Sequence, residues 1–227
     1  MKKALSLLLA VLLLTICFVP MAFAEDGAPS REDIRGHGDI TPPKKDSWLS
    51  SYETRYVCSS GGVAAFLFKA PKLDNDLVFD NVLEGTELTL LAKETDTKNN
   101  VDFYLVKLAD RRVGWICVGQ TSEDTKLLDS VPELKEGTWI LKLGESDKDT
   151  YAVKFGAQRT ATLLRLSDGR RFTSHWILSC RRVRVKEMYL TWNGEEFVGR
   201  TQYKTADGKV YCTLTADTEG LYDKLAG

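Results

Sequence analysis

Apolar and polar residues alternate in short runs along most of this chain, and turn-forming residues separate the runs. In segment 103–116, two alternating arms flank a polar turn, and a glycine stands directly before Trp115. Upstream, Glu84-Gly85-Thr86 forms a tight-turn signal ahead of another apolar run. Short strands with closely spaced turns are typical of a small β-barrel. The pattern predicts a long loop over 70–82 and strands over 54–58, 64–69, 88–93, 103–108 and 112–118.

A second series of alternating runs extends from Trp139 to about residue 218. Three turn signals divide it, namely Asp168-Gly169, Asn193-Gly194 and Asp207-Gly208, and Asn-Gly is the strongest short-range hairpin signal. Strand periodicity places Trp176 and Leu178 on one face of their run. We therefore expect seven or eight antiparallel strands without a helix, which form a meander that closes into a barrel.

The first 24 residues predict a secretory signal peptide. Two lysines precede the apolar run 4–19, and small residues stand at the two positions that a signal peptidase reads. Cleavage is expected before Glu25. One alternative is an uncleaved membrane anchor, but the run is short for a span of roughly 20 apolar residues. Another is a lipoprotein attached at Cys17, but Ile16 stands where a lipobox has a small residue. We expect a secreted or cell-wall-associated protein with no stable membrane span in its mature form.

Residues 25–51 are rich in Gly, Pro, Ser, Asp and Lys, a composition that predicts a disordered or extended linker. The fold class expected for the chain is all-β, with two folded domains after this linker. The expected division is a signal peptide at 1–24, a linker at 25–51, a first β-domain at 52–121, a connector at 122–137, a second β-barrel at 138–218 and a tail at 219–227.

Charge is nearly balanced over the whole protein but not along it. Without Lys2 and Lys3, 29 basic side chains stand against 32 acidic ones, a net charge of −3 that argues against nucleic acid as a partner. Between residues 156 and 186, however, the sequence contains eight basic residues and only one acidic residue, Asp168. Alternation places Arg182, Arg184 and Lys186 on one strand face. Arginine forks suit phosphate or carboxylate, so these residues are candidates for binding a teichoic-acid-like polymer or an acidic glycan. The alternative is a solvated outer face.

Four cysteines remain after cleavage, and they allow three connectivities. Their distribution between the two domains favours disulfides joining Cys58 to Cys117 and Cys180 to Cys212. The alternative is four small, half-buried thiols. Neither a CxxC pair nor a spaced Cys/His quartet is present, so no structural metal is expected.

Signatures of catalysis are absent from the sequence: there is no GxSxG elbow and no HExxH helix. His175 is the only histidine in an expected folded segment, and Cys180, five residues along the same strand, would face away from it. We expect a non-catalytic protein without a cofactor. An enzyme that uses His175 with nearby carboxylates is a third hypothesis.

The first β-domain resembles bacterial SH3 (SH3b) domains. The resemblance rests on the turn and strand 83–91, the aromatic strand 103–108 and the closing Gly114-Trp115-Ile116. The chain departs from the family at 66–71, where the arginine and glycine of the loop string are missing, and at Asp110-Arg111, which replaces the usual Asp-Gly turn. The resemblance implies a module that binds wall peptides or other extracellular proteins or peptides. The aromatic candidates for that contact are Tyr56, Phe68, Phe103, Tyr104 and Trp115. Alternatively, these rings pack the core.

The second domain resembles lipocalin-like (calycin) barrels at Gly137-Thr138-Trp139, at the Trp176 strand and at segment 196–199. That resemblance implies a carrier of a small ligand. The domain is short for the group, so its interior is expected to be filled by side chains. The leading hypothesis is a secreted, non-catalytic binding protein whose second barrel adds a contact surface, and a small-molecule carrier is the alternative.

Overall fold

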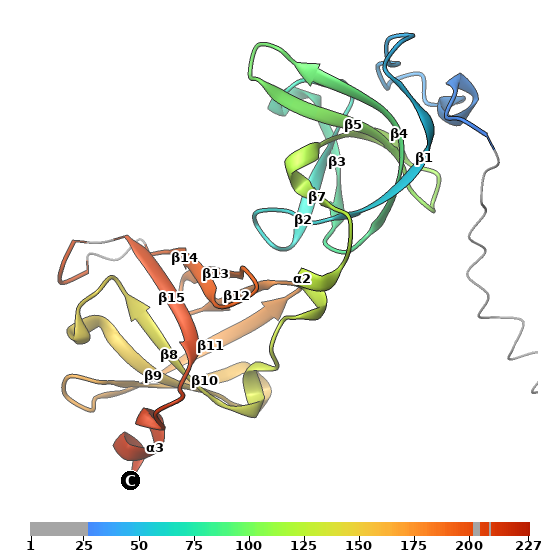
Figure 1. Ribbon diagram of the computed structural model, residues 1–227. Helices are drawn as coiled ribbons and strands as arrows, with labels where there is room; N and C mark the ends of the chain where they lie inside the picture. Colours follow the sequence, from blue (N-terminus) through green and yellow to red (C-terminus); the bar gives the residue numbers. More distant parts are fainter. Residues whose placement is uncertain (1–26, 202–204, 209) are drawn as a thin grey trace, which may run out of the picture.

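The computed structural model describes residues 27–201, 205–208 and 210–227, and it consists of two antiparallel β units (Figure 1). The expected all-β class is confirmed. The expected signal peptide at 1–24 lies outside the described residues. Within them, no helix combines the length and the apolar character needed to cross a bilayer.

The N-terminal unit is one strongly curved antiparallel sheet of seven strands, in the order β3-β2-β6-β5-β4-β1-β7 (Figure 1). Pairing among the described residues leaves β3 and β7 at the two ends and does not close this sheet into the small barrel that the sequence predicts. Its strands are β1 (Trp48–Val57), β2 (Ala64–Phe68), β3 (Val78–Leu83), β4 (Glu87–Asp96), β5 (Val101–Lys107), β6 (Val113–Cys117) and β7 (Thr121–Ser122).

Two apolar clusters cover the two faces of this sheet. Tyr104 and Val106 belong to one cluster and Phe103 and Leu105 to the other, because successive strand residues point to opposite faces. The five strands expected from the sequence are all present, but β3 adds a strand within the segment expected to be loop. The connection between β2 and β3 is therefore shorter than the predicted loop. It ends with the short 3₁₀ helix Asn75–Leu77, directly before β3.

The segment before β1, expected to be a disordered linker, instead lies against the N-terminal sheet. Ser30 caps the 3₁₀ helix Arg31–Ile34, and Ile40 is buried in the cluster that contains Trp115. The indole Nε1 of Trp115 donates a hydrogen bond to the carbonyl oxygen of Thr41 at 2.9 Å. The hydroxyl of Tyr52 and the ammonium group of Lys107 both contact the carboxylate of Asp33. A few apolar and polar anchors thus hold a segment whose composition is that of a linker.

The second unit is a closed barrel of eight strands in which each strand pairs with the next one along the chain and β15 pairs with β8 (Figure 1). This confirms the expected meander barrel. Its strands are β8 (Thr138–Leu143), β9 (Thr150–Phe155), β10 (Thr160–Arg165), β11 (Arg171–Ser179), β12 (Arg182–Val185), β13 (Met188–Trp192), β14 (Phe197–Arg200) and β15 (Tyr211–Ala216).

Side chains occupy the interior of the barrel. One apolar cluster runs through it and includes Leu141, Leu163, Leu190 and Phe197, all fully buried. Outside the barrel, the short helix α3 (Leu221–Ala226) places Tyr222 against Ile140, Ala152 and Leu164, in the segment expected to be a tail. The one-turn helix α2 (Lys126–Asp129) lies in the connector between the two units.

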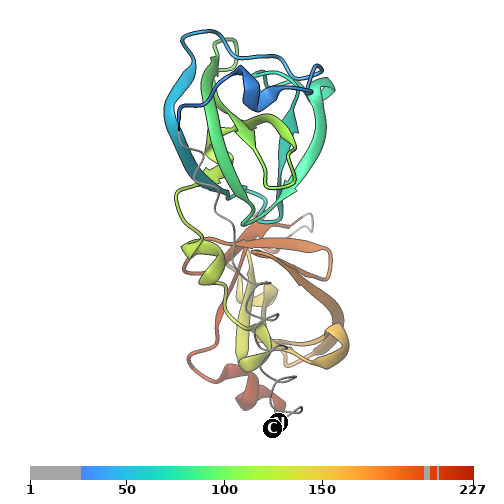
Figure 2. The same ribbon diagram turned by 90° about the vertical axis from the view of Figure 1, so that its right-hand side faces the viewer.

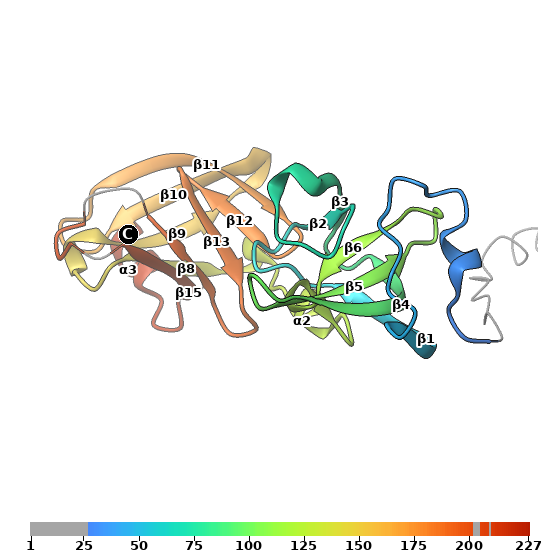
Figure 3. The ribbon, with the colours of Figure 1, turned by 90° about the horizontal axis from the view of Figure 1, so that it is seen from above.

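The two units meet where the turn between β11 and β12 approaches the loop after β1 (Figures 2 and 3). Arg181, in that turn, is 4% exposed. Its Nε donates to Glu84 Oε1 at 2.7 Å, its Nη1 donates to the carbonyl oxygen of Trp192 at 2.7 Å and its Nη2 donates to that of Ser59 at 2.6 Å. The second carboxylate oxygen of Glu84 accepts hydrogen bonds from the backbone N–H and the hydroxyl of Ser59. The buried charges are therefore fully partnered across the contact.

A glycine is required for this approach. Gly62 has a φ of +66°, and its carbonyl oxygen accepts the backbone N–H of Arg181 at 3.0 Å. A Cβ at this position would lie 2.6 Å from Cγ2 of Thr191 and 3.1 Å from Cβ of Arg181. Both the left-handed backbone and the lack of space favour glycine.

We expect Arg181→Ala to lower the free energy of unfolding by about 3–5 kcal/mol, because it leaves the carboxylate of Glu84 buried without its cation. Urea unfolding followed by tryptophan fluorescence measures the change. The matched control is Arg170→Ala, which removes an exposed arginine from the same barrel and should change stability by no more than about 0.5 kcal/mol. Equal unfolding midpoints for Arg181→Ala and wild type would contradict the prediction.

Candidate functional site

The aromatic residues proposed from the SH3b resemblance do not form a surface groove. Trp115 and Phe103 are completely buried, and Phe68 is 3% exposed. The rings of Phe68 and Phe103 meet edge to face with their centroids 5.5 Å apart. Tyr104 is 8% exposed, and Tyr56 is half-buried. A ring inside the core cannot stack on a ligand, so the alternative reading of these residues, core packing, describes Phe68, Phe103, Tyr104 and Trp115.

The expected disulfides are not formed, since Cys58, Cys117, Cys180 and Cys212 are all free thiols. Cys212 points into the barrel from β15, whereas Cys180 occupies the turn after β11 with a φ of +51°. Burial raises the pKa of the Cys212 thiol to about 11, and burial also raises the pKa values of Cys58 and Cys117. The protonated thiol is therefore favoured at these three positions.

The proposed basic residues follow strand alternation only in part. Val183 and Val185 point into the barrel, and Arg182 and Arg184 lie on the outer face of β12. The guanidinium carbons of the two arginines lie 5.6 and 5.5 Å from the ring centroid of Tyr189, which is half exposed on β13. The structure therefore brings two cations and one aromatic ring together on the outside of the barrel.

Arg182 and Lys186 make contacts within the protein that Arg184 does not make. The Nε of Arg182 donates to the carbonyl oxygen of Gly61 at 2.7 Å, so Arg182 belongs to the contact between the two units. Lys186 follows the end of β12 with a φ of +54°, and its ammonium group lies over the rings of Tyr151 and Phe172. Arg184 is exposed and makes no ion pair with a described residue.

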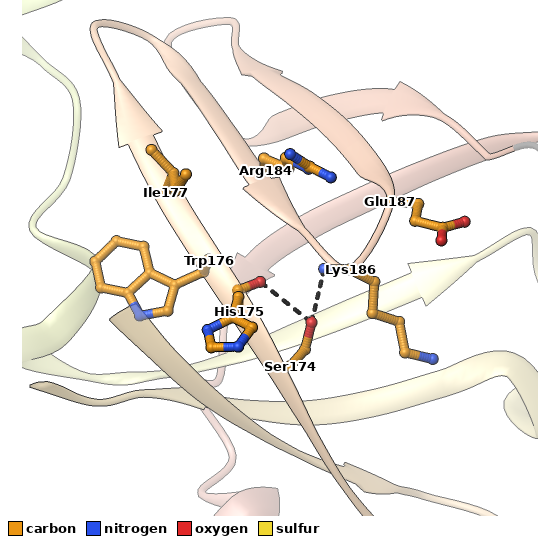
Figure 4. A pocket seen from close by; sticks show the side chains of 7 residues that line it. All are labelled: Ser174, His175, Trp176, Ile177, Arg184, Lys186 and Glu187. Carbon is orange, nitrogen blue, oxygen red and sulfur yellow. Dashed lines mark hydrogen bonds between the residues drawn. The ribbon is translucent and has the colours of Figure 1, made fainter. Parts of the chain in front are cut away.

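A groove of about 500 Å³ opens beside Arg184 (Figure 4). Its lining consists of Ser174, His175, Trp176, Ile177, Arg184, Lys186 and Glu187. The hydroxyl of Ser174 accepts the backbone N–H of Lys186 at 2.9 Å and donates to the carbonyl oxygen of His175 at 3.1 Å (Figure 4). This hydroxyl is committed to the backbone rather than to the imidazole beside it. Among the described residues, no group of three His, Cys, Asp or Glu side chains is arranged to hold a metal ion.

A second groove, of about 330 Å³, adjoins the first at Trp176 and Ile177. It adds Lys135 and Arg159 to the same side of the barrel. The ammonium group of Lys135 lies 6.0 Å from the ring centroid of Trp176. Arg159 has a φ of +59°, a left-handed conformation that is uncommon for residues other than glycine. Together the two grooves are lined by four basic side chains, Lys135, Arg159, Arg184 and Lys186, and two acidic ones, Glu133 and Glu187.

Sequence reasoning missed Tyr189 and Arg200 as parts of this surface. Both are exposed and lie directly opposite each other on β13 and β14. Alternation within each strand predicts that they point outward, but only strand pairing shows that they are neighbours of Arg184.

Comparisons with known proteins give no match. No protein-family model, curated sequence or solved structure resembles the chain closely enough to be identified. Function is therefore inferred from the geometry of the described residues.

We expect all four described cysteines to be free thiols in solution. Alkylation with iodoacetamide in denaturant without reductant, followed by mass spectrometry, should modify Cys58, Cys117, Cys180 and Cys212. Without denaturant, Cys212 should react most slowly among those with raised pKa values, because it is 1% exposed and its thiol stays protonated. A sample that gains modified cysteines only after reduction would show that disulfides form in solution and would contradict this prediction.

Proposed function

We propose that this chain is a secreted, non-catalytic binding protein that recognises an anionic cell-wall polymer through the outer face of its barrel. The observation that carries the proposal is the exposed position of Arg184 against Tyr189, with no ion pair to a described residue and with grooves on the adjoining strand. A guanidinium group that lacks an internal acid is available to a phosphate or carboxylate, which it binds through two parallel hydrogen bonds.

The alternative of a small-molecule carrier has less support. A carrier of the lipocalin kind holds its ligand inside the barrel, and here large side chains such as Trp139, Trp192 and Phe197 fill that space. The two grooves described above are open to solvent and are lined in part by exposed residues of β11 and β12, such as His175, Ile177 and Arg184. This arrangement suits an extended ligand that stays partly in contact with water.

The N-terminal sheet has a supporting role in this proposal. We infer an SH3b-like module from the turn at 83–86, which leads into β4, and from Gly114-Trp115 on β6. Because its aromatic residues are buried, its contribution to binding is to hold the β11–β12 turn. Carbonyl oxygens of Ser59 and Gly61 accept hydrogen bonds from Arg181 and Arg182, which lie three and two residues before Arg184, respectively.

The test is co-sedimentation of residues 25–227 with insoluble cell-wall sacculi, with and without their teichoic acid. We expect wild type to sediment and Arg184→Ala to bind about tenfold more weakly, since a hydrogen bond to a charged group contributes about 1.5–3 kcal/mol. Binding should also weaken as salt is raised, because the contact is exposed to solvent.

The matched control is Arg170→Ala, which changes the net charge equally but removes an exposed arginine that already pairs with Asp168. It should sediment like wild type. Absence of sedimentation by wild type, or equal losses in the two variants, would count against the proposal.

A further inference from the structure

Five exposed side chains line up across five neighbouring strands of the barrel. Ile177 on β11 lies opposite Arg184, Arg184 lies opposite Tyr189, Tyr189 lies opposite Arg200, and Arg200 lies opposite Tyr211 on β15. Directly opposed residues of an antiparallel pair project from the same face. All five are exposed, so they form one continuous line on the outside of the barrel, which we name the cross-strand row.

Cations and aromatic rings alternate along the cross-strand row. Adjacent strands are about 4.8 Å apart, which places the backbones of Arg184 and Arg200 about 10 Å apart with Tyr189 between them. Neither arginine makes an ion pair with a described residue. Tyr189 and Tyr211 are 50% and 40% exposed. The row therefore repeats an anion-binding fork and an exposed aromatic side chain at the spacing of the strands.

Internal contacts fix the end of the row at Tyr211. Its hydroxyl donates to Glu145 Oε1 at 2.5 Å, and this hydrogen bond to a carboxylate raises the pKa of Tyr211 to about 12. Tyrosine is already neutral near pH 7 at its usual pKa, so the effect of this hydrogen bond on the row is to hold the ring beside the carboxylate of Glu145. At the other end, Ile177 borders the groove lined by Lys135, Arg159 and Glu133, so two basic side chains and one acidic side chain lie beyond the row.

We propose that the cross-strand row binds a linear polysaccharide in which an acidic sugar alternates with a neutral one. The inference rests on the function proposed above and specifies its ligand class. One sugar ring advances a glycan chain by nearly the distance between two strands. A chain laid across the strands therefore brings an acidic sugar to each arginine and places the intervening neutral sugar on Tyr189.

Each part of the row has a distinct task in this arrangement. Arg184 and Arg200 donate bidentate hydrogen bonds to successive carboxylate or sulfate groups. The apolar face of the neutral sugar packs against the ring of Tyr189, which is flat and rigid and costs little conformational entropy to order. A polyol-phosphate chain has no ring to place on the tyrosine. Such a ligand would use the arginines alone.

The test is isothermal titration of residues 25–227 with hyaluronan fragments, whose uronic acid alternates with a neutral amino sugar. We expect binding of hyaluronan and none of dextran, a neutral glycan. Arg184→Ala, Arg200→Ala and Tyr189→Ala should each weaken binding about tenfold or more. Tyr189→Phe should bind like wild type, because it keeps the ring, and Lys142→Ala, an exposed lysine on β8, is the charge-matched control. Unchanged urea midpoints show that the variants are folded.

Competition with polyphosphate, an anion without sugar rings, distinguishes binding by ring stacking from binding by charge alone. Competition by polyphosphate as effective as hyaluronan itself, together with full binding by Tyr189→Ala, would overturn the proposed ligand class. Failure of wild type to bind hyaluronan while it still sediments with sacculi would overturn this inference and leave the proposed function standing. Failure in both assays would overturn both.

Discussion

The arrangement of this molecule depends on one buried ion pair, between Arg181 of the barrel and Glu84 of the N-terminal sheet. Removing two charges from water is costly, and the cost is offset only when their remaining hydrogen-bonding groups are also partnered. Here the guanidinium group also donates to two carbonyl oxygens, and the carboxylate accepts from Ser59. The approach further requires Gly62, where a side chain would collide with Thr191. The contact is therefore specific in both charge and shape.

This contact has a consequence for the outer face of the barrel. Arg181 and Arg182 are both held by the loop after β1, so the beginning of β12 is fixed by the neighbouring unit as well as by its own strand partners. Arg184 follows within the same strand and remains exposed to solvent. Because the N-terminal unit holds the start of this short strand, the backbone of Arg184 is held in position although its side chain is exposed to solvent.

Closure of the barrel leaves only its outside for the recognition that we propose. Eight strands give an interior that side chains can fill, and in this chain they do so with leucines, valines and three tryptophans. The outward positions are then the ones left for binding. Because one row across the strands draws on positions as distant as 177 and 211, it can combine residue types that never stand together along the chain.

Local patterns predicted most of the strands and turns and the inward or outward direction of most barrel residues, because alternation and Asn-Gly or Asp-Gly turns are local properties of the chain. They missed β3, which lies in a segment predicted to be a loop. The sequence by itself also identified Arg182 and Arg184 as outward basic residues. The tertiary structure decided everything that depends on what covers a face. Trp115 and Phe103 are core residues because the segment that contains Ile40 and Thr41, unremarkable in composition, covers that side of the sheet. The cysteines stay apart because strand pairing sends Cys212 inward and leaves Cys180 in a turn. The neighbours of Arg184 follow from register, a long-range property set by barrel closure, and no local pattern encodes it.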